Sequence, residues 1–343
     1  MDVLSDVLLA VRLTGAVFFD VEASSPFATE SPRGEVIRER LMADAGHVIG
    51  FHVVTEGDCW AEAVDRPEAP QHLRAGEMVI FPAGDANTMA SSPRMRGRPD
   101  WSLYYRPVDE ALPFSISLTS PDREAADASR CHFVCGFLAC DARPFNPLVA
   151  SLPRIVRAPV SDRSWQWMSG LLDVATTPGE PGDAGREAML AKLAELMFVE
   201  ALRAHIDALP PDARGWVAGL RDPQVGAVLR LMHGRPSEPW TLSGLAHEVG
   251  MSRSSLAERF TTYVEVPPMQ YLTRWRLQLA AGLLEGGNVG VSGAAAAVGY
   301  RSEAAFHRAF KRYVGTSPGA WRRGPAEGGA PVDAGATPRS RGA

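Results

Sequence analysis

The stretch VGYRSEAAFHRAFKRYVGTSP, residues 298–318, decides the fold of the last third of this 343-residue chain. Ser302 is a favourable helix N-cap, because its hydroxyl can accept a hydrogen bond from an unpaired backbone N–H of the first helical turn. Phe306, Phe310 and Tyr313 follow at spacings of four and three residues. This spacing predicts a helix from Glu303 that buries one apolar face against its neighbours.

The opposite face of this predicted helix is short at its start and basic further on, and it carries Ala304, His307, Arg308 and Lys311. Such a face suits a helix whose first turns approach base edges while later residues contact phosphates. In the preceding SGAAAAVGY, Ala295 and Gly299 lie four residues apart, which is the spacing of a helix-turn-helix. A buried amphipathic helix pair would show the same spacing, so this signal alone leaves both interpretations open.

The same pattern occurs about fifty residues earlier, where Ser252, Leu256, Phe260, Tyr263 and Pro268 correspond to Ser302, Phe306, Phe310, Tyr313 and Pro318. An internal repeat in this register predicts two copies of one unit. The connecting segment has an apolar stripe and a glycine stop, formed by Tyr271, Leu272, Trp275, Leu279, Leu283, Gly286 and Gly287. A helix of about 17 residues spans roughly 25 Å, which suits two helices in successive major grooves about 34 Å apart.

These residues resemble the AraC/XylS-type transcriptional regulators over about residues 222–323, most specifically in the second repeat, in GTSPGAWRR and in PPMQYLTRWRL. The resemblance implies a sequence-specific regulator that binds double-stranded promoter DNA, works with RNA polymerase, and uses no cofactor. Two residues depart from the family pattern. Glu265 stands where the family usually has a glycine, as at Gly315, and Gly293 stands where it usually has an apolar core residue. Glycine inside a helix costs about 1 kcal/mol relative to alanine, so a protein with a decayed DNA-binding half stays open as an alternative.

Within the two predicted motifs, the expected DNA contacts are the N-terminal and outward-facing residues of each second helix. Arginine favours guanine and glutamate can accept a hydrogen bond from cytosine, so we expect the first motif to discriminate bases and the second chiefly to anchor to the backbone. The expected residues are Ser252, Arg253, Ser254, Ser255, Ala257, Glu258, Arg259, Arg301, Ser302, Glu303, Ala304, His307, Arg308, Lys311 and Arg312.

Charge is divided unequally along the chain, whose formal net charge is −5. Residues 222–323 hold 12 Lys or Arg against 7 Asp or Glu, whereas the remainder holds 23 against 33. A basic segment in an acidic chain is expected when one domain meets phosphates and another does not. A solvated basic surface is the alternative.

The N-terminal part predicts short strands separated by glycine and proline turns, with a hairpin at Glu56, Gly57 and Asp58. The absence of predicted helices between these strands favours an antiparallel sandwich or barrel. The stretch GEMVIFPAGDAN resembles the second motif of cupins, and residues 5–150 resemble the cupin sensor domain that precedes AraC-type DNA-binding domains. The predicted fold class is therefore an α+β multidomain protein with a cupin-like barrel, connecting helices and an all-α domain with two helix-turn-helix motifs.

The barrel carries few candidate metal ligands. His47 and His52 are five residues apart and so lie on opposite faces of a regular strand. Asn87, beside Asp85, occupies the position where a cupin histidine would complete a metal site, and asparagine is a poor ligand for transition metals. We therefore expect no catalytic residue and no metal.

All four cysteines, Cys59, Cys131, Cys135 and Cys140, fall in this domain. They either sense an oxidant as a thiol cluster or are simply small core residues. The residues expected to sense a small-molecule or oxidant effector are His52, Cys59, Asp85, Asn87, Cys131 and Cys135.

Two helices are predicted between these parts, one capped at Ser161 with Trp165, Met168, Leu171 and Leu172 on one face, and a longer one with the stripe Met189, Leu193, Leu196, Met197 and Leu202. The longer helix is either core or the interface of a homodimer. No apolar run suits a membrane span and the N-terminus has no basic leader, so we expect a cytoplasmic protein. The expected divisions are a sensor domain at 1–153, connecting helices at 154–215, the DNA-binding domain at 216–323, and a disordered tail at 324–343.

Overall fold

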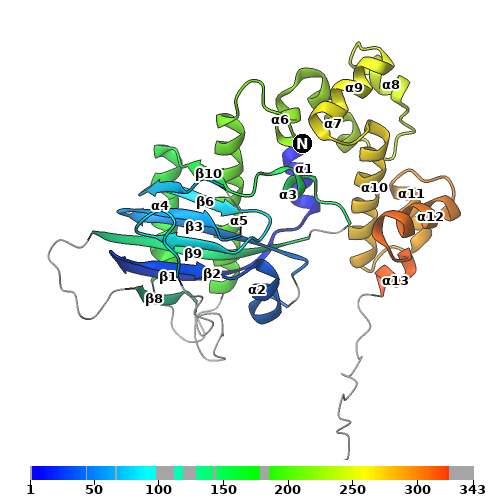
Figure 1. Cartoon of the computed structure of the whole chain (residues 1–343). Coiled ribbons are helices and arrows are strands. Elements are labelled where there is room, and N and C mark those ends of the chain that lie inside the picture. Colours follow the sequence, from blue (N-terminus) through cyan, green and yellow to red (C-terminus); the bar gives the residue numbers. More distant parts are fainter. Residues whose placement is uncertain are drawn as a thin grey trace, which may run out of the picture.

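A computed structural model describes residues 2–43, 45–65, 68–97, 112–118, 129–141, 144–177 and 185–323. Within these residues a β-rich N-terminal part precedes a part made only of helices (Figure 1). The tail at 324–343, expected to be disordered, lies outside the described residues. Among the helices in the described ranges, none has the length and apolar character needed to cross a membrane.

The β-rich part consists of two facing sheets, one six-stranded with the order β10-β6-β3-β9-β1-β8 and one four-stranded with the order β2-β7-β4-β5. β3 and β9 are buried along nearly their whole length, because a helix layer covers one side of the larger sheet and the smaller sheet covers the other. β4 alternates buried and partly exposed residues, as a strand with one solvated face does. The strands are β1 (Thr14–Ser24), β2 (Ala28–Ser31), β3 (His47–Glu56), β4 (Asp58–Ala63), β5 (Gln71–Arg74), β6 (Glu77–Phe81), β7 (Asn87–Ala90), β8 (Phe114–Leu118), β9 (Arg130–Cys140) and β10 (Val156–Pro159).

The expected hairpin at Gly57 is wrong, because β3 and β4 belong to different sheets. β3 pairs with β6 and β9, whereas β4 pairs with β5 and β7. Gly57 has a φ of +72°, and a Cβ added there would lie 2.1 Å from the carbonyl oxygen of Arg130. Only glycine therefore allows the chain to turn against β9 and cross from one sheet to the other.

Two further expectations for this part need correction. A helix does interrupt the strands, since α2 (Gly34–Leu41) lies between β2 and β3. In the described part of the chain the strands pair antiparallel, except that β8 lies parallel to β1. The rest of the predicted fold class agrees with the structure, in which a β-rich part precedes helices arranged as two helix-turn-helix units.

Two long helices, α4 (Asp162–Thr176) and α5 (Arg186–Ala208), follow the short α3 (Pro147–Ser151). Ser161 caps α4 as expected, with its side chain accepting from the backbone N–H of Ser164. α5 packs on the six-stranded sheet through a face that includes Leu193, Met197 and Leu202 from the expected stripe. Met189 and Leu196 are exposed instead, as is Leu171 of α4, because the buried face of each helix is rotated away from them. β10 pairs with β6, so the sheet extends beyond residue 153.

The helical part forms two groups of helices joined by a long connecting helix, α10. Gly286 is the C-cap of α10, as the glycine stop predicted, but Leu283 is exposed and the buried positions near this end are Ala280, Ala281 and Leu284. The helices are α6 (Trp216–Arg221), α7 (Pro223–Gly234), α8 (Leu242–Glu248), α9 (Arg253–Val264), α10 (Pro268–Glu285), α11 (Val291–Ala297), α12 (Glu303–Val314) and α13 (Pro318–Arg322).

The buried apolar residues form two separate cores, and the division falls inside α10. The larger core runs without interruption from the β sheets through α6–α9 to Trp275. The smaller core begins at Leu277 and contains the buried residues of α11 and α12, ending at Phe310. The helices α6–α9 thus share a core with the β-rich part, whereas α11 and α12 have their own.

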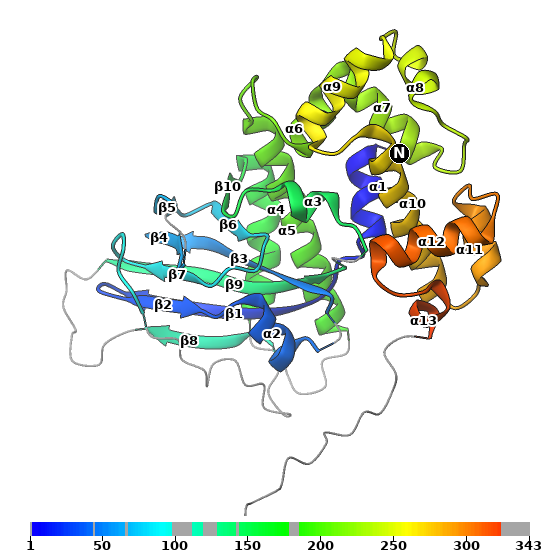
Figure 2. The same ribbon diagram turned by 45° about the vertical axis from the view of Figure 1, so that its right-hand side comes forward.

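The N-terminal helix α1 (Val3–Ala10) lies against α7 and α10 rather than on the β sheets (Figure 2). Gln278 of α10 is buried and donates to the carbonyl oxygen of Ala10 at 3.2 Å, while its own carbonyl oxygen accepts from the N–H of Phe145 at 2.8 Å. Arg12 pairs with Asp141, Nε to Oδ2 at 2.8 Å, and also with Glu285 at the end of α10. Polar contacts therefore tie α10 to both ends of the sensor segment.

Candidate nucleic-acid interface

The first helix-turn-helix consists of α8 and α9, with the turn at Gly250. Thr241 caps α8 and Ser252 caps α9, and each side-chain oxygen accepts from the backbone N–H three residues on. Gly250 has a φ of +66°, a conformation that L side chains rarely adopt. The N–H of Met251 then returns to the carbonyl oxygen of Ala246 at 2.9 Å and closes the turn.

The second helix-turn-helix, α11 and α12, repeats this geometry. Gly299 has a φ of +84°, the N–H of Tyr300 bonds to the carbonyl oxygen of Ala295 at 2.9 Å, and Ser302 caps α12 by accepting from the N–H of Ala305 at 3.3 Å. The repeat predicted from sequence is therefore structural. Gly293 is exposed, so this departure from the family pattern does not open the core.

The two second helices end differently, because α9 is followed by Glu265 and α12 by Gly315. Both residues adopt the left-handed conformation, with φ of +59° and +88°. Glutamate pays a steric penalty of about 1–2 kcal/mol in this conformation and glycine pays none. The sequence departure at Glu265 is thus a site of backbone strain in the first motif.

On α9, most of the side chains expected to contact DNA are exposed and Ala257 is half-buried; the exposed ones are Ser252, Arg253, Ser254, Ser255, Glu258 and Arg259. Arg259 differs from the others because Asp222 holds it. Its Nε lies 3.1 Å from both carboxylate oxygens and its Nη2 lies 2.5 Å from Oδ2. Asp222 is buried and also caps α7 by accepting from the N–H groups of Gln224 and Val225. The structure therefore assigns Arg259 to an intramolecular ion pair between α9 and α7.

Burial alone would raise the pKa of Asp222, but the hydrogen bonds from Arg259 and Val225 outweigh it and leave that pKa below its usual value. Sequence reasoning missed Asp222. The Asp-Pro pair at residues 222–223 is a recognisable helix start, whereas the partnership with Arg259, 37 residues away, has no local signal.

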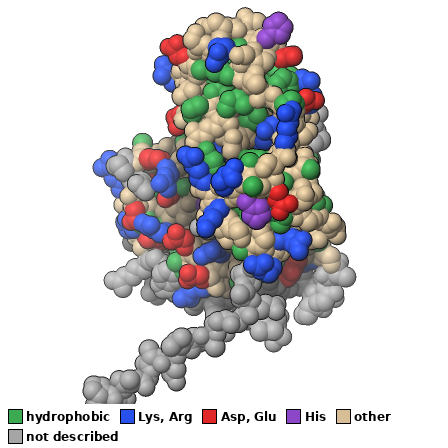
Figure 3. Space-filling view, turned by 90° about the vertical axis from the view of Figure 1, so that its right-hand side faces the viewer, with side chains coloured by type: hydrophobic (Ala, Val, Ile, Leu, Met, Phe, Trp, Pro, Cys, Tyr) green, Lys and Arg blue, Asp and Glu red, His purple; other side chains and the backbone are tan. Residues whose placement is uncertain are grey.

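On α12, the residues expected to contact DNA are likewise exposed, except that His307 is half-buried; they are Arg301, Ser302, Glu303, Ala304, Arg308, Lys311 and Arg312. His307 Nε2 lies 3.7 Å from a carboxylate oxygen of Glu303, one turn earlier. The guanidinium of Arg312 lies over the ring of Tyr313, 5.7 Å from its centroid. Figure 3 shows Lys and Arg side chains gathered across the middle of the face turned toward the viewer.

The orientation of the two motifs is fixed by contacts on α10 and on the loop between α7 and α8. Near the start of α10, the hydroxyl of Tyr271 accepts from Trp216 Nε1 at 2.8 Å and lies 2.8 Å from His233 Nε2. All three side chains are buried in the first motif. Burial lowers the pKa of His233 to about 3. Further along, Arg276 donates to the carbonyl oxygens of Pro236 and Glu238, each at 2.6 Å.

The turn glycine of the second motif rests on the same loop. A Cβ at Gly299 would lie 2.4 Å from the carbonyl oxygen of Ser237. Since α10 has 18 residues, it spans about 27 Å at about 1.5 Å per residue, so the rigid spacer predicted from sequence is present.

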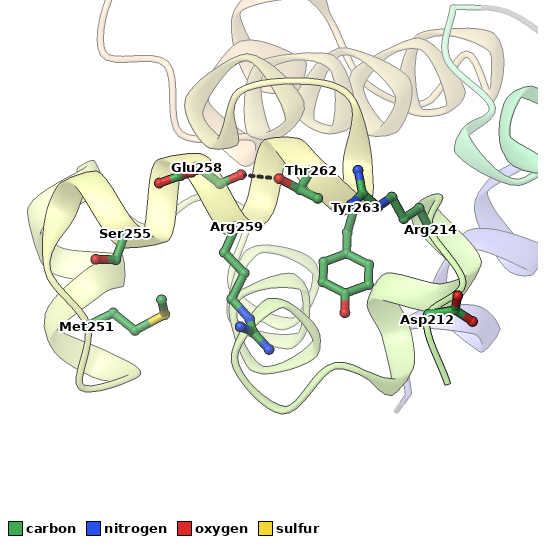
Figure 4. A pocket seen from close by; sticks show the side chains of 8 residues that line it. All are labelled: Asp212, Arg214, Met251, Ser255, Glu258, Arg259, Thr262 and Tyr263. Atoms are coloured by element: carbon green, nitrogen blue, oxygen red, sulfur yellow. Dashed lines mark hydrogen bonds between the residues drawn. The ribbon is translucent and has the colours of Figure 1, made fainter. Parts of the chain in front are cut away.

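A groove of about 500 Å³ runs along α9 beside the segment that precedes α6 (Figure 4). Its floor includes Ser255, Glu258 and Arg259, and Figure 4 shows Arg259 and Tyr263 projecting to the same side of the helix. Asp212 and Arg214, from the proline-marked hinge, close the other side. Sequence reasoning did not connect this hinge with α9, because nothing local in residues 210–214 signals the contact.

In the sensor domain, the structure brings together His52 and Asn87 but takes Asp85 elsewhere. His52 is buried, its Nε2 lies 2.7 Å from Asn87 Oδ1, and its Nδ1 has no hydrogen-bond partner in the described residues. Burial lowers its pKa to about 4. The carboxylate of Asp85 accepts from Arg154 at 2.8 and 2.9 Å. Within the described residues, no group of three or more His, Cys, Asp or Glu side chains is placed to hold a metal ion.

The four cysteines are free and buried, and two of them are in contact. The thiols of Cys59 on β4 and Cys131 on β9 lie close enough to interact across the two sheets, while Cys135 lies further along β9. Burial raises the pKa of the Cys135 thiol, and it raises the pKa of Cys140 to about 12. Cys140 sits at the other end of β9, where its sulfur lies 3.9 Å from Asn146 Nδ2.

Both halves of the chain match models of known protein families. The family model described as "Cupin" matches residues 2–207, and the one described as "Helix-turn-helix domain" matches residues 245–324. A putative AraC-like transcription regulator of Streptomyces lividans is 31% identical over 95% of this chain and 99% of its own length. The RCS-specific HTH-type transcriptional activator RclR of Escherichia coli is 32% identical over 94% of this chain and 97% of its own length.

Among solved structures, the DNA-binding domain of AdpA in complex with a target DNA is 31% identical, covering 30% of this chain and 91% of that one, with a TM-score of 0.29. The relatives that align with nearly the whole chain are transcription regulators, not enzymes. The paired helix-turn-helix motifs and the β-rich domain ahead of them therefore have one common identity: the chain belongs to the AraC family of DNA-binding transcription regulators, with an N-terminal cupin domain and a C-terminal helix-turn-helix domain.

Proposed function

We propose that this regulator recognises promoter DNA with α9 as the base-discriminating helix and α12 chiefly as an anchor on the phosphate backbone. This division of roles rests on the difference between the exposed faces of α9 and α12. α9 offers Arg253, Ser254 and Glu258, whose side chains can distinguish base edges. α12 ends with Arg308, Lys311 and Arg312, which suit phosphates. Arg259 is left out of the base-contacting set because Asp222 already holds it.

The test begins with selection of preferred sites from a random double-stranded DNA library by the full-length protein. Arg253→Ala should lose about 1–3 kcal/mol on the preferred site and little on a site changed at one base step. Lys311→Ala should weaken all sites alike and reduce the dependence of log K on log salt by about one unit. Arg74→Ala on β5 and Lys192→Ala on α5 remove the same charges from exposed positions outside the DNA-binding helices and serve as matched controls.

Equal affinity of the Arg253→Ala variant and the parent protein for every sequence would show that α9 does not discriminate through this residue. Selection of no site at all by the parent protein would favour the alternative of a decayed DNA-binding half, which the strained Glu265 cap motivates.

The regulator is further proposed to act as a homodimer through α4 and α5. Leu196 is 50% exposed and Trp167 is 38% exposed, and both line a groove of about 870 Å³ between these helices. The groove is lined by charges of both signs, as a self-complementary contact needs, and these are Arg163, Arg203, Glu200 and Asp207. Leu196→Glu should shift the protein to the monomer in sedimentation equilibrium, whereas Lys192→Ala, one turn earlier on α5, should not. A dimer that persists in Leu196→Glu would place the interface elsewhere.

The cupin domain is proposed to receive a small-molecule or oxidant effector that changes how the DNA-binding helices engage promoter DNA and RNA polymerase. Such a signal works only if it binds or modifies one arrangement of the domains better than the other. Arg12 and Gln278 support this role, because they join α10 directly to the segments at both ends of the sensor.

A further inference from the structure

Cys59 and Cys131 lie in different sheets but are held against each other by the backbone. The turn at Gly57 presses on β9 so closely that a Cβ there would lie 3.2 Å from the Cα of Cys131. Two residues later, the side chain of Cys59 is fully buried where β4 contacts β9, and its thiol lies close enough to that of Cys131 to interact with it. Both cysteines are free. The crossing of the chain between sheets thus places two thiols in contact.

The three cysteines of β9 cannot form a disulfide with one another. Cys131 and Cys135 are four residues apart on one strand, which separates their Cα atoms by about 13 Å. A disulfide requires a Cα separation below about 7 Å. Cys140 is five residues beyond Cys135, so these two are about 16 Å apart. Cys131 is the β9 cysteine that the turn at Gly57 approaches, and its thiol interacts with that of Cys59.

Cys131 also lines an open pocket of about 390 Å³, whereas Cys59 is absent from its lining. Arg130 and His132 bring cationic groups to this pocket, and Glu22 and Glu56 bring anionic ones. His132 Nε2 lies 2.7 Å from Asp20 Oδ1. This contact raises the pKa of His132, and the hydrogen bond from Cys59, with His132 nearby, lowers the pKa of the Cys131 thiol.

We propose that Cys59 and Cys131 form a redox pair that a hydroperoxide oxidises to a disulfide linking the two sheets, and that this bond is the signal the sensor receives. The inference rests on the proposed function, since the signal needs a DNA-binding response. Cys131 is the attacking residue because it borders the pocket, and Cys59 is the resolving residue because it lies behind Cys131.

The chemistry balances with the hydroperoxide as the only oxidant. The sulfur of the Cys131 thiolate attacks the terminal peroxide oxygen, the O–O bond breaks, and the leaving alkoxide or hydroxide takes a proton to give an alcohol or water. The product is a sulfenic acid at Cys131. The Cys59 thiol then attacks that sulfur, the S–O bond breaks, and water leaves with the thiol proton. The two cysteines lose two electrons in total, and the peroxide gains them.

β9 connects this site to the DNA-binding part. The strand begins at Arg130 beside the pair and ends at Cys140, and the next residue, Asp141, holds Arg12, which also contacts Glu285 on α10. A disulfide at one end of β9 would restrain this strand, and the residue after its other end, Asp141, is linked to α10 through Arg12. We therefore expect the disulfide to change DNA affinity.

The chemical test treats the reduced full-length protein with equimolar hydrogen peroxide and maps cysteines by alkylation and non-reducing peptide mass spectrometry. The expected product is one cross-linked peptide pair containing Cys59 and Cys131, lighter by two hydrogen atoms. In Cys59→Ser, dimedone should label Cys131 as its sulfenic acid, and in Cys131→Ser no dimedone adduct should form. Cys140→Ser, at the far end of β9, is the matched control and should cross-link like the parent protein.

Several outcomes would overturn the pairing: both thiols remaining open to alkylation after peroxide, a cross-link that contains Cys135 or Cys140, or dimedone on Cys59. Thermal melting of each variant shows that it is folded, and the Cys140→Ser control shows whether loss of one buried thiol alone changes reactivity.

The regulatory half is tested on the DNA sites selected by the parent protein. The isolated disulfide form should differ from the reduced form in affinity by at least about fivefold, and Cys59→Ser should not respond to peroxide. Equal affinity of the two forms would refute redox sensing while leaving DNA binding intact. If neither form selects a site, the proposed function fails together with this regulatory half, and the mapped disulfide still decides the chemical half.

Discussion

Asp222 joins the two helices that support the first motif, and its replacement should loosen α7 and α9 in separable steps. Its carboxylate caps α7 and pairs with Arg259 of α9. Loss of an N-cap costs about 1 kcal/mol. The ion pair contributes no more than about 1 kcal/mol, because the Arg259 side chain is 43% exposed and solvent screens it. Asp222→Ala should therefore cost about 2 kcal/mol, whereas Asp222→Asn keeps a good cap and should cost about 1 kcal/mol or less.

Hydrogen–deuterium exchange followed by mass spectrometry can separate these steps, because it reports local opening. Peptides from α7 should lose protection in Asp222→Ala and keep it in Asp222→Asn, and peptides from α12 should be unchanged in both, since α12 belongs to the other core. Equal loss in the two variants would show that the cap contributes nothing, and loss in α12 would show that the two motifs do not open independently.

The stability that the Asp222 carboxylate contributes should depend on pH, and the direction of this dependence follows from the pKa of Asp222. The pKa of Asp222 is lowered in the folded state, so its contribution is fully present above the unfolded value of about 4 and disappears as the pH falls through the folded value. Protection of α7 in the parent protein should therefore decrease in acid below about pH 4, relative to Asp222→Asn, which has no charge to lose.

Three further outcomes follow from the helical part. Glu265→Gly should stabilise the first motif by about 0.5–1 kcal/mol, since relief of the left-handed conformation is partly offset by the flexibility of glycine in the unfolded chain. Gly315→Ala should destabilise the second motif by about 1 kcal/mol, and a thermal melting temperature that is lower for Glu265→Gly than for Gly315→Ala would contradict the strain at Glu265. His233, whose pKa is lowered to about 3, is neutral when folded, so its contribution is complete above about pH 6.5 and falls by about 1.4 kcal/mol per unit as the pH drops toward the folded value; urea midpoints that do not fall between pH 7 and 5 would show that it is solvated. Gly299→Ala forces its Cβ onto the backbone of Ser237 and should move the second motif relative to the first, which lowers affinity for a two-site DNA more than for either half-site; equal losses on the three DNAs would refute the coupling.

The features predictable from sequence were those with a local chemical signature. Ser252 and Ser302 were predicted as caps because a hydroxyl before an apolar stripe satisfies a free N–H, and the repeat followed from residues at matching spacings. The crossing at Gly57 was not predictable, since alternation of apolar residues identifies a strand but not the sheet it joins. For the same reason the role of Arg259 was missed: its exposure on α9 resembles that of its neighbours, and only the tertiary position of Asp222 removes it from the set available to DNA.

The boundary between the two cores, inside α10 at residues 275–277, also bears on how such regulators diversify. Substitutions of the buried residues of α11 and α12 alter packing mainly within the small core, so the interior of that motif can change with little effect on the sensor. The first motif has no such freedom, because any change in its interior is also a change in the interior of the domain that receives the signal. Among descendants of this chain, substitutions of buried residues should therefore accumulate in α11 and α12 before they accumulate in α8 and α9.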